Sequence, residues 1–354
     1  MSIWHASSAT NAQWDAWLRT FPGAHVYQSS AWARYKQLAG WQSVRLLLSA
    51  DTGDAGGDNT PRALVQGLIK RAPLIGGMMW VPGGPVWRGV PLTQAKAALG
   101  EALGMASGAR YVRLFDMSEV RAVPAAADPF AAVGQPDAAP VYAAPWRRPQ
   151  VRNGSGASVL IDVLQAREAW LAAMTGKHRY TVRRALREPV QWRTGNDAPQ
   201  LAALATLTGE MSRIKGAAHR RAADQLLAQS AALGSSVLTL VGYLDGQPVT
   251  ACQVLRWETI AIYATAATNQ AGRAISAAYA MIAELRDLLR AAGVEALDFG
   301  GIDPHNPAAR GVDHFKLGFG GRTLAYAGEW EWAASPLARV LGNFAVRVRR
   351  GGGA

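Results

Sequence analysis

Cysteine is nearly absent from this sequence, which has a single such residue, Cys252, among 354. An internal disulfide framework and a cysteine-rich metal site are therefore both excluded. Cys252 lies in the apolar run from Val249 to Leu255, where we expect a small buried side chain. The fold must depend on its core, for which 49% hydrophobic and 18% charged residues are sufficient.

Long apolar segments are missing as well. No apolar run reaches the ~20 residues that are needed to span a bilayer. The first 15 residues lack the basic region and apolar stretch that are typical of a signal peptide. We therefore expect a soluble, cytoplasmic protein, and the length corresponds to two domains or one large domain.

Several catalytic motifs are also absent. The chain has neither the Gly-x-Ser-x-Gly motif of a serine hydrolase nor the Gly-x-x-x-x-Gly-Lys-Ser/Thr motif of a phosphate-binding loop. Its six histidines form no His-x-x-x-His pair and no spacing that is typical of metal ligands. We expect no metal site.

Acidic residues are few relative to basic ones. The chain has 25 Asp and Glu against 37 Lys and Arg, a net charge of +12. This balance favours a polyanionic partner, such as a nucleic acid, a phosphorylated substrate or an anionic membrane. A general compositional bias toward arginine is the alternative explanation.

The two halves of the chain predict the same order of elements. The first half predicts strands at 44–49, 63–70 and 78–81, a helix at 93–106 and a strand at 111–116. The second predicts strands at 236–244, 249–257 and 260–267, a helix at 275–292 and a strand at 296–301. An antiparallel meander followed by a helix and a further strand is the core order of the GNAT acyltransferase fold. The sequence therefore predicts an α/β fold with mixed sheets in two tandem GNAT-like domains.

Local signals place further elements. Thr10 and Gln13 have the spacing of a capping box, and a second helix should start at Ser29 or Ser30 and end at Gly40. Residues 119–156 are rich in Ala, Pro and Gly, which predicts a connector. Beyond it we expect strands at 159–163 and 190–194, and helices at 166–174, 177–188, 199–213 and 219–233.

Three other segments allow a functional or a purely structural interpretation. Arg179, Arg183 and Arg187 share one helix face, which suits either phosphate or RNA contacts or simple solvation. The loop 269–274 lies where GNAT enzymes hold the coenzyme A pyrophosphate, although it also fits an ordinary loop before a helix. The basic segment 336–350 could dock on the protein, or contact an anionic membrane or tRNA.

Three segments combine aromatic, basic and glycine residues in a distinctive way. They are Tyr27-Gln28-Ser29-Ser30 with Trp32, Lys36 and Gly40-Trp41; Lys177-x-Arg179 with Arg183-Arg184-Ala185; and Leu297-Asp298-Phe299-Gly300-Gly301 followed by His314-Phe315-Lys316-Leu317-Gly318-Phe319-Gly320-Gly321. In this order, over residues 10–335, they resemble the FemABX family of peptidoglycan bridge-forming aminoacyltransferases. The resemblance implies a first domain of residues 1–150 and 317–354, completed by chain that returns after the second domain, and a second domain of residues 151–316.

The resemblance also implies an activity. The family transfers an amino acid from an aminoacyl-tRNA to the side-chain amine of residue three in the peptidoglycan stem peptide, which is carried on a UDP-linked or a lipid-linked muropeptide. These two substrates are the implied partners, and no cofactor is expected because coenzyme A is not used. Residues 199–233 show no sustained heptads, so the chain is similar to family members without a coiled-coil arm.

Substrate-binding residues can be carried over by position. Lys36 and Arg179 match the family positions that hold the diphosphate of the acceptor, and both side chains suit phosphate oxygens. Tyr263, on the strand expected at 260–267, is a further match. Lys177 and Arg183 lie in the same basic segment as Arg179 and are candidates for substrate binding.

Catalytic candidates come from the same comparison. Phe315 and Lys316 match the pair near the acceptor end of the tRNA, where Lys316 would stabilise the oxyanion or hold the terminal phosphate. Asp116 and Glu331 are the carboxylates expected to assist proton removal. Two other functions stay open: an N-acyltransferase of the same fold that uses an acyl-coenzyme A, and a non-catalytic binder of tRNA or cell-wall precursor.

Overall fold

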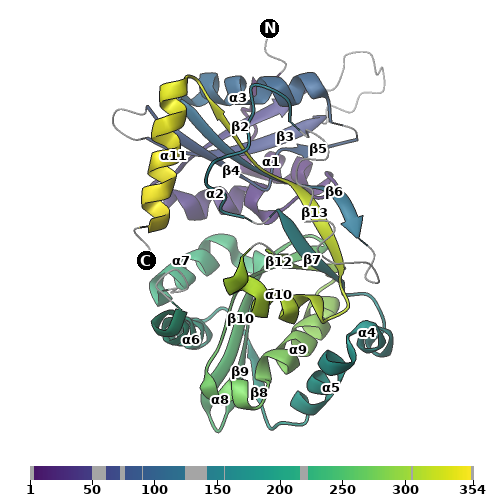
Figure 1. Cartoon of the computed structure of the whole chain (residues 1–354). Helices are drawn as coiled ribbons and strands as arrows, with labels where there is room; N and C mark the ends of the chain where they lie inside the picture. The colour runs from purple at the N-terminus through teal and green to yellow at the C-terminus, as the bar shows by residue number, and fades with distance from the viewer. Residues whose placement is uncertain are drawn as a thin grey trace. The chain divides into compact units, whose positions relative to one another are not determined.

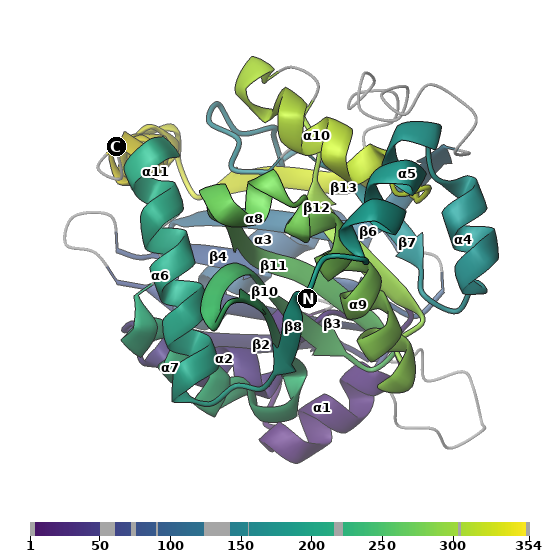
Figure 2. The same ribbon diagram turned by 90° about the horizontal axis from the view of Figure 1, so that it is seen from below.

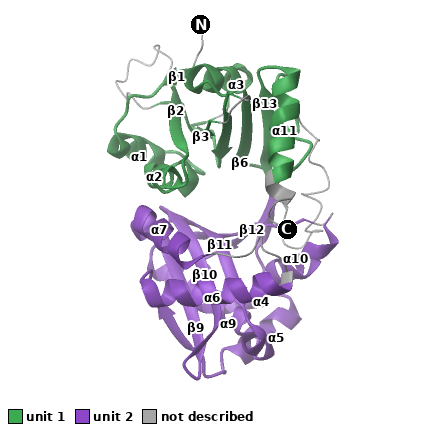
Figure 3. Cartoon of the chain, turned by 90° about the vertical axis from the view of Figure 1, so that its left-hand side faces the viewer, with its two compact units in different colours: residues 1–120, 135–156, 325–352 green, residues 121–134, 157–324, 353–354 purple. Residues whose placement is uncertain are grey.

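The computed structural model describes residues 4–49, 61–71, 76–89, 91–123, 142–154, 156–215, 222–303 and 306–351. Half of the connector expected at 119–156 lies outside these residues, and in the described half Tyr142 and Trp146 are buried in a hydrophobic core. The chain forms two compact units, shown in Figure 3: unit 1 contains residues 1–120, 135–156 and 325–352, and unit 2 contains residues 121–134, 157–324 and 353–354. The units thus divide at 156/157 and 324/325, where the sequence suggested 150/151 and 316/317.

Unit 1 is an α/β unit built on one mixed sheet. Its strands are β1 (Trp4–Ala6), β2 (Gln42–Leu48), β3 (Ala63–Lys70), β4 (Met78–Pro82), β5 (Val86–Trp87), β6 (Tyr111–Val123) and most of β13 (Arg322–Ala333). Its helices are α1 (Asn11–Arg19), α2 (Ser30–Gln37), α3 (Thr93–Ser107) and α11 (Pro336–Gly351), with a 3-10 turn at Val26–Gln28 (Figure 1). The strand order is β1-β2-β3-β4-β6-β13, and β5 pairs with β3.

Unit 2 is built in the same way. Its strands are β7 (Ala157–Asp162), β8 (Gln191–Thr194), β9 (Val237–Leu244), β10 (Gln247–Trp257), β11 (Ile260–Thr268) and β12 (Ala296–Gly301). Its helices are α4 (Arg167–Ala173), α5 (Gly176–Ala185), α6 (Ala198–Lys215), α7 (Ala223–Leu233), α8 (Gln270–Ala274), α9 (Ala277–Ala291) and α10 (Arg310–Leu317). The strand order is β7-β12-β11-β10-β9-β8.

The repeated order that the sequence predicted is confirmed. In unit 1, β2, β3 and β4 are antiparallel, and β4 pairs in parallel with β6 after the crossover helix α3. In unit 2, β9, β10 and β11 are antiparallel, and β11 pairs in parallel with β12 after α9. The β11–β12 ladder stops after Ile262 and Asp298, although both strands continue. The carboxyl ends of these two strands are therefore not joined by backbone pairing.

Side-chain alternation assigns helices to the two faces of the unit 2 sheet. On β10, Ala251 is the register partner of Val241 on β9 and of Ala267 on β11. These three side chains form a buried cluster with leucines of α6 and α7. The next register partners, Leu240 and Cys252, belong to the core that includes α9, α4 and α5. Figure 2 shows α6 and α7 on one side of these strands and α9 on the other. The expected burial of Cys252 is confirmed.

The helix caps and the tight turn that the sequence predicted are present in the structure. Thr10 Oγ1 accepts a hydrogen bond from the Gln13 N–H, and Ser29 caps α2 in the same way. Asp245 and Gly246 both have positive φ, as the tight β9–β10 turn requires. Unit 1 also has elements that the sequence did not predict: β1, β5 and the long helix α11.

Candidate active site

A cavity of about 390 Å³ lies within unit 1. Most of its wall is apolar or aromatic, from Trp32, Trp41, Leu68, Met78, Met79, Trp80 and Val346. Its polar wall residues are Lys36 on α2, Arg113 on β6 and Asn153. The ammonium group of Lys36 in a mostly apolar wall suits a ligand that combines an anionic group with a flat or apolar one.

Lys36, chosen from the sequence as a phosphate ligand, is part of this wall. Its Nζ lies 4.6 Å from the ring centroid of Trp32 and 4.8 Å from that of Tyr35. Both residues lie on α2, within one turn of Lys36. Cation–π contacts of this kind hold an ammonium group in place without neutralising its charge, so it can still pair with an anion.

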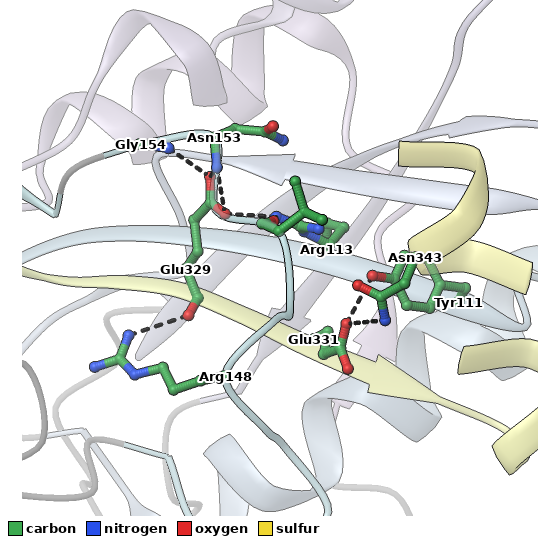
Figure 4. A network of polar contacts seen from close by, with 9 residues as sticks. Tyr111, Arg113, Arg148, Asn153, Gly154, Glu329, Glu331 and Asn343 are labelled. Carbon is green, nitrogen blue, oxygen red and sulfur yellow. Dashed lines mark hydrogen bonds and ion pairs between the residues drawn. The ribbon is translucent and has the colours of Figure 1, made fainter. Parts of the chain in front are cut away.

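Arg113 is a cavity residue that sequence reasoning missed. Its side chain is 2% exposed, and Nη2 donates to Glu329 Oε2 at 2.5 Å and to the Val151 carbonyl at 2.6 Å (Figure 4). Glu329 in turn accepts from the backbone N–H groups of Asn153 and Gly154 at 3.0 Å. Nε and Nη1 of Arg113 have no hydrogen-bond partner among the described residues. Glu329 thus fixes and neutralises the buried guanidinium group of this cavity residue.

The two carboxylates proposed for proton removal lie elsewhere in unit 1. Glu331 is 2% exposed and accepts from Tyr111 Oη and Asn343 Nδ2, both at 2.8 Å (Figure 4). Asp116 is fully buried and accepts from Tyr142 Oη at 2.8 Å, and burial raises the pKa of Asp116. Neither residue belongs to the cavity wall described above. Their catalytic role stays a prediction, and their contacts are those of residues that join structural elements.

Lys316 lies in unit 2, at the end of the β11–β12 ladder. It is half-buried on α10, and its Nζ donates to the carbonyl of Gly301 at 2.6 Å. Desolvation lowers the pKa of Lys316, while the negative charges of Asp298 and Asp313 oppose this effect. Asp298 also accepts from the N–H of Gly300 at 2.7 Å, which fixes the turn that Lys316 contacts. The ammonium group is thus held at the carboxyl end of β12.

Aromatic rings surround this end of β12. Phe315 lies 5.1 Å from Tyr279 and 5.0 Å from Phe319, measured between ring centroids. Phe299 on β12 lies between Phe315 and Tyr263, at 6.5 Å and 5.5 Å. Desolvation raises the pKa of Tyr263 well above its ordinary value. The structure therefore brings Lys316, Phe315 and Tyr263 into one region of unit 2.

The basic residues predicted on α5 are at the surface of unit 2. Lys177 and Arg183 are exposed, and Arg179 is half-buried with Nη1 donating to the Ala172 carbonyl at 3.2 Å. Lys36 and Arg179, which the resemblance pairs on one diphosphate, belong to different units.

His178 joins α5 to the helix that carries Lys316. The residue is 1% exposed; its Nδ1 lies 3.0 Å from Thr175 Oγ1 and its Nε2 lies 3.2 Å from the Phe315 carbonyl. Since a carbonyl only accepts, Nε2 carries the proton and Nδ1 accepts from the hydroxyl. A Cβ atom at Gly318 would lie 2.1 Å from the imidazole, so the glycine is required for this approach. Sequence reasoning missed His178 as a positioning residue.

The burial of His178 predicts a pH-dependent stability. Burial lowers the pKa of His178 in the folded state, whereas an unfolded histidine has a pKa of about 6.5. The unfolded state then binds more protons, so this contribution to stability is complete above about pH 6.5 and is lost as pH falls through the folded pKa. Urea unfolding between pH 5 and 8 should show a steeper acid loss for wild type than for His178→Gln. His5→Gln, an exposed control, should follow wild type; parallel profiles for wild type and His178→Gln would contradict the assignment.

The loop 269–274 is largely closed by its own hydrogen bonds. It forms the short helix α8, in which Asn269 Oδ1 accepts from the Gly272 N–H at 2.9 Å and the Asn269 carbonyl accepts from the Arg273 N–H at 3.0 Å. The N–H of Ile275 donates to the Ala271 carbonyl at 3.4 Å. A Cβ atom at Gly272 would lie 2.4 Å from the Val249 carbonyl, so this glycine allows close packing on β10.

Both units have the strand and helix order of a GNAT acyltransferase domain, and the family model described as "Acetyltransferase (GNAT) domain" matches residues 176–317. The solved structures narrow this class to a FemABX-like fold. The crystal structure of FemX has a TM-score of 0.75 to this chain at 15% identity, covering 96% of this chain and 100% of that one. The resemblance recognised in the sequence is thus confirmed at the level of the fold.

Two other structures share the fold more distantly. The C-terminal domain of a putative lysylphosphatidylglycerol synthetase from Agrobacterium fabrum has a TM-score of 0.53 at 13% identity, covering 96% of this chain and 97% of that one. A tandem GNAT protein from the clavulanic acid biosynthesis pathway has a TM-score of 0.51 at 13% identity, covering 94% and 98%. A search of curated protein sequences found no match. Among the described residues, no helix has the length and apolar character that crossing a membrane requires.

Proposed function

We propose that this protein is an aminoacyltransferase that moves an amino acid from an aminoacyl-tRNA to the side-chain amine at position three of a peptidoglycan stem peptide. The acceptor is a muropeptide linked to UDP or to lipid. The observation that carries the proposal is the place of Lys36 in the wall of the unit 1 cavity. The diphosphate of such an acceptor has the charge that the ammonium group of Lys36 suits, and the aromatic wall suits its flat or apolar part.

The choice of donor rests on the loop 269–274. An acyl-coenzyme A enzyme needs backbone N–H groups at this loop for the pyrophosphate. The N–H groups of Gly272, Arg273 and Ile275 already donate to acceptors within the chain. This favours an aminoacyl-tRNA, with no cofactor, over the acyl-coenzyme A alternative.

The reaction itself needs little from the protein beyond positioning. The acceptor amine attacks the carbonyl carbon of the ester, the carbonyl π electrons move to oxygen, and collapse of the tetrahedral oxyanion expels the tRNA ribose oxygen. The ribose oxygen takes a proton, and the amine loses one. Lys316, held by Gly301, would stabilise the oxyanion as its charge develops.

Replacement of Lys36 by methionine tests the acceptor site. Methionine keeps an apolar side chain of similar length but removes the charge, so the apparent KM for a UDP-linked muropeptide should rise about tenfold while kcat changes little. Arg19→Met is the control, because Arg19 is an exposed basic residue at the end of α1 and does not belong to the cavity wall. Equal kinetics for wild type and Lys36→Met would remove Lys36 from the acceptor site.

The reaction class is tested by following label from charged tRNA. Radiolabelled glycine, serine or alanine on tRNA is supplied with UDP-linked or lipid-linked muropeptide, and acetyl-coenzyme A is supplied in parallel. Label that reaches a muropeptide, with the transfer abolished when the charged tRNA is first digested with ribonuclease, supports the proposal. Acetyl transfer to an amine, with no transfer to either muropeptide, would instead support the acyl-coenzyme A alternative.

A further inference from the structure

The outer face of α11 bears an apolar stripe. Leu337, Val340, Phe344 and Val348 are 66%, 65%, 63% and 55% exposed. Their spacing of three, four and four residues places them along one side of the helix. Every other described helix has at most one exposed large apolar side chain. We therefore examine these four residues, named the α11 stripe, as a candidate binding surface.

The opposite face of α11 is fixed to unit 1. Asn343 donates to Glu331, and Arg339 forms an ion pair with the same carboxylate at 3.3 Å. Gly342 lies so close to Tyr111 that a Cβ atom there would lie 2.4 Å from the ring. Val346 is part of the cavity wall. The helix is held by its inner face, so the α11 stripe is not a core surface of unit 1.

Charge distinguishes between the possible occupants of the stripe. Helix α11 contains four arginines, at 339, 347, 349 and 350, and no acidic residue. Arg347 is exposed and lies one turn after Phe344, beside the stripe. A surface that is apolar along its middle and basic at its edge complements anionic headgroups above acyl chains. A nucleic-acid duplex turns its phosphates outward and offers no continuous apolar surface to match the stripe, and a second copy would bring two basic helices together.

We propose that α11 is an interfacial helix that binds unit 1 to the surface of an anionic lipid bilayer. The α11 stripe enters the boundary between headgroups and acyl chains, and Arg347 contacts the headgroup phosphates. The helix lies in the plane of the surface, because its inner face stays bound to unit 1. This property does not depend on the reaction proposed above.

Vesicle co-sedimentation of the whole chain tests this. Phosphatidylglycerol vesicles should bind the protein at least tenfold more tightly than phosphatidylcholine vesicles. The double substitution Val340→Gln with Phe344→Gln should weaken binding at least tenfold, and Arg347→Gln should weaken it about fivefold at low salt. Met105→Gln and Leu38→Gln are matched controls, since both side chains are in unit 1 and are 66% and 69% exposed. Circular dichroism verifies that each variant is folded.

Three results would overturn the proposal. They are no binding to phosphatidylglycerol vesicles, equal loss in the control variants, and unchanged binding in the double variant. If tRNA displaces the protein from vesicles while the apolar substitutions have no effect, the surface is a polyanion site and the proposal is wrong. Tight binding to an acidic protein without any vesicle binding would also contradict it.

Discussion

Replacement of Lys316 by methionine should lower kcat by about 10²- to 10³-fold, with a smaller effect on the KM for the muropeptide. This is the size of effect seen when one donor to a developing oxyanion is removed. The substitution removes the charge that lies at Gly301 and keeps the apolar stem. Single-turnover transfer from charged tRNA, measured with saturating acceptor, isolates this step from product release.

Lys70→Met provides the control for Lys316. Lys70 also donates to a backbone carbonyl, that of Ala39 at 3.2 Å, but it is exposed at the end of β3. The Lys70→Met variant should retain the kcat of the wild-type protein. If Lys316→Met changes only the urea midpoint and leaves kcat intact, Lys316 is a structural residue and its catalytic assignment is wrong.

Replacement of Glu329 by glutamine should lower the free energy of unfolding by about 3–5 kcal/mol, because it leaves the buried guanidinium of Arg113 without its counter-charge. Glu329 and Arg113 are each 2% exposed, so solvent gives little compensation. Glutamine also has one carbonyl oxygen in place of the two that receive the N–H groups of Asn153 and Gly154. Urea unfolding followed by tryptophan fluorescence measures the change.

A double-mutant cycle separates the ion pair from general damage. Glu329→Gln combined with Arg113→Met should lose less stability than the sum of the two single variants, since no unpaired charge remains. Glu101→Gln, at an exposed position on α3, should stay within about 0.5 kcal/mol of wild type. Additive effects of the two substitutions would show that Glu329 does not stabilise Arg113.

The fold was predictable from the sequence where local signals were strong. Strand β3 was predicted at its observed bounds because Gly-rich and Pro-containing segments flank an apolar run. The β9–β10 hairpin followed from Asp245-Gly246. Helix α11 was missed although its large apolar residues repeat at helical spacing, because its arginines made the segment resemble a basic tail.

The candidate site was predictable only in part, for a physical reason. Lys36 and Lys316 lie in local patterns of aromatic and glycine residues that a sequence displays directly. Arg113 depends on Glu329, which is 216 residues away, and His178 depends on the Phe315 carbonyl, which is 137 residues away. The sequence around Arg113, a single arginine in an apolar strand, does not indicate that Glu329 is its partner. The role of His178 arises from its packing against Gly318.

The return of the chain into unit 1 has a consequence for biosynthesis. A ribosome adds residues 325–352 after all of residues 157–324, so unit 2 can fold while unit 1 still lacks β13 and α11. During that interval the edge of β6 has no β13 to pair with, and α3 lacks the Trp332 ring that contacts Gly100. The unit whose synthesis begins first is therefore finished last. A released chain truncated before residue 325 would carry all but the last two residues of unit 2 together with an aggregation-prone, incomplete unit 1.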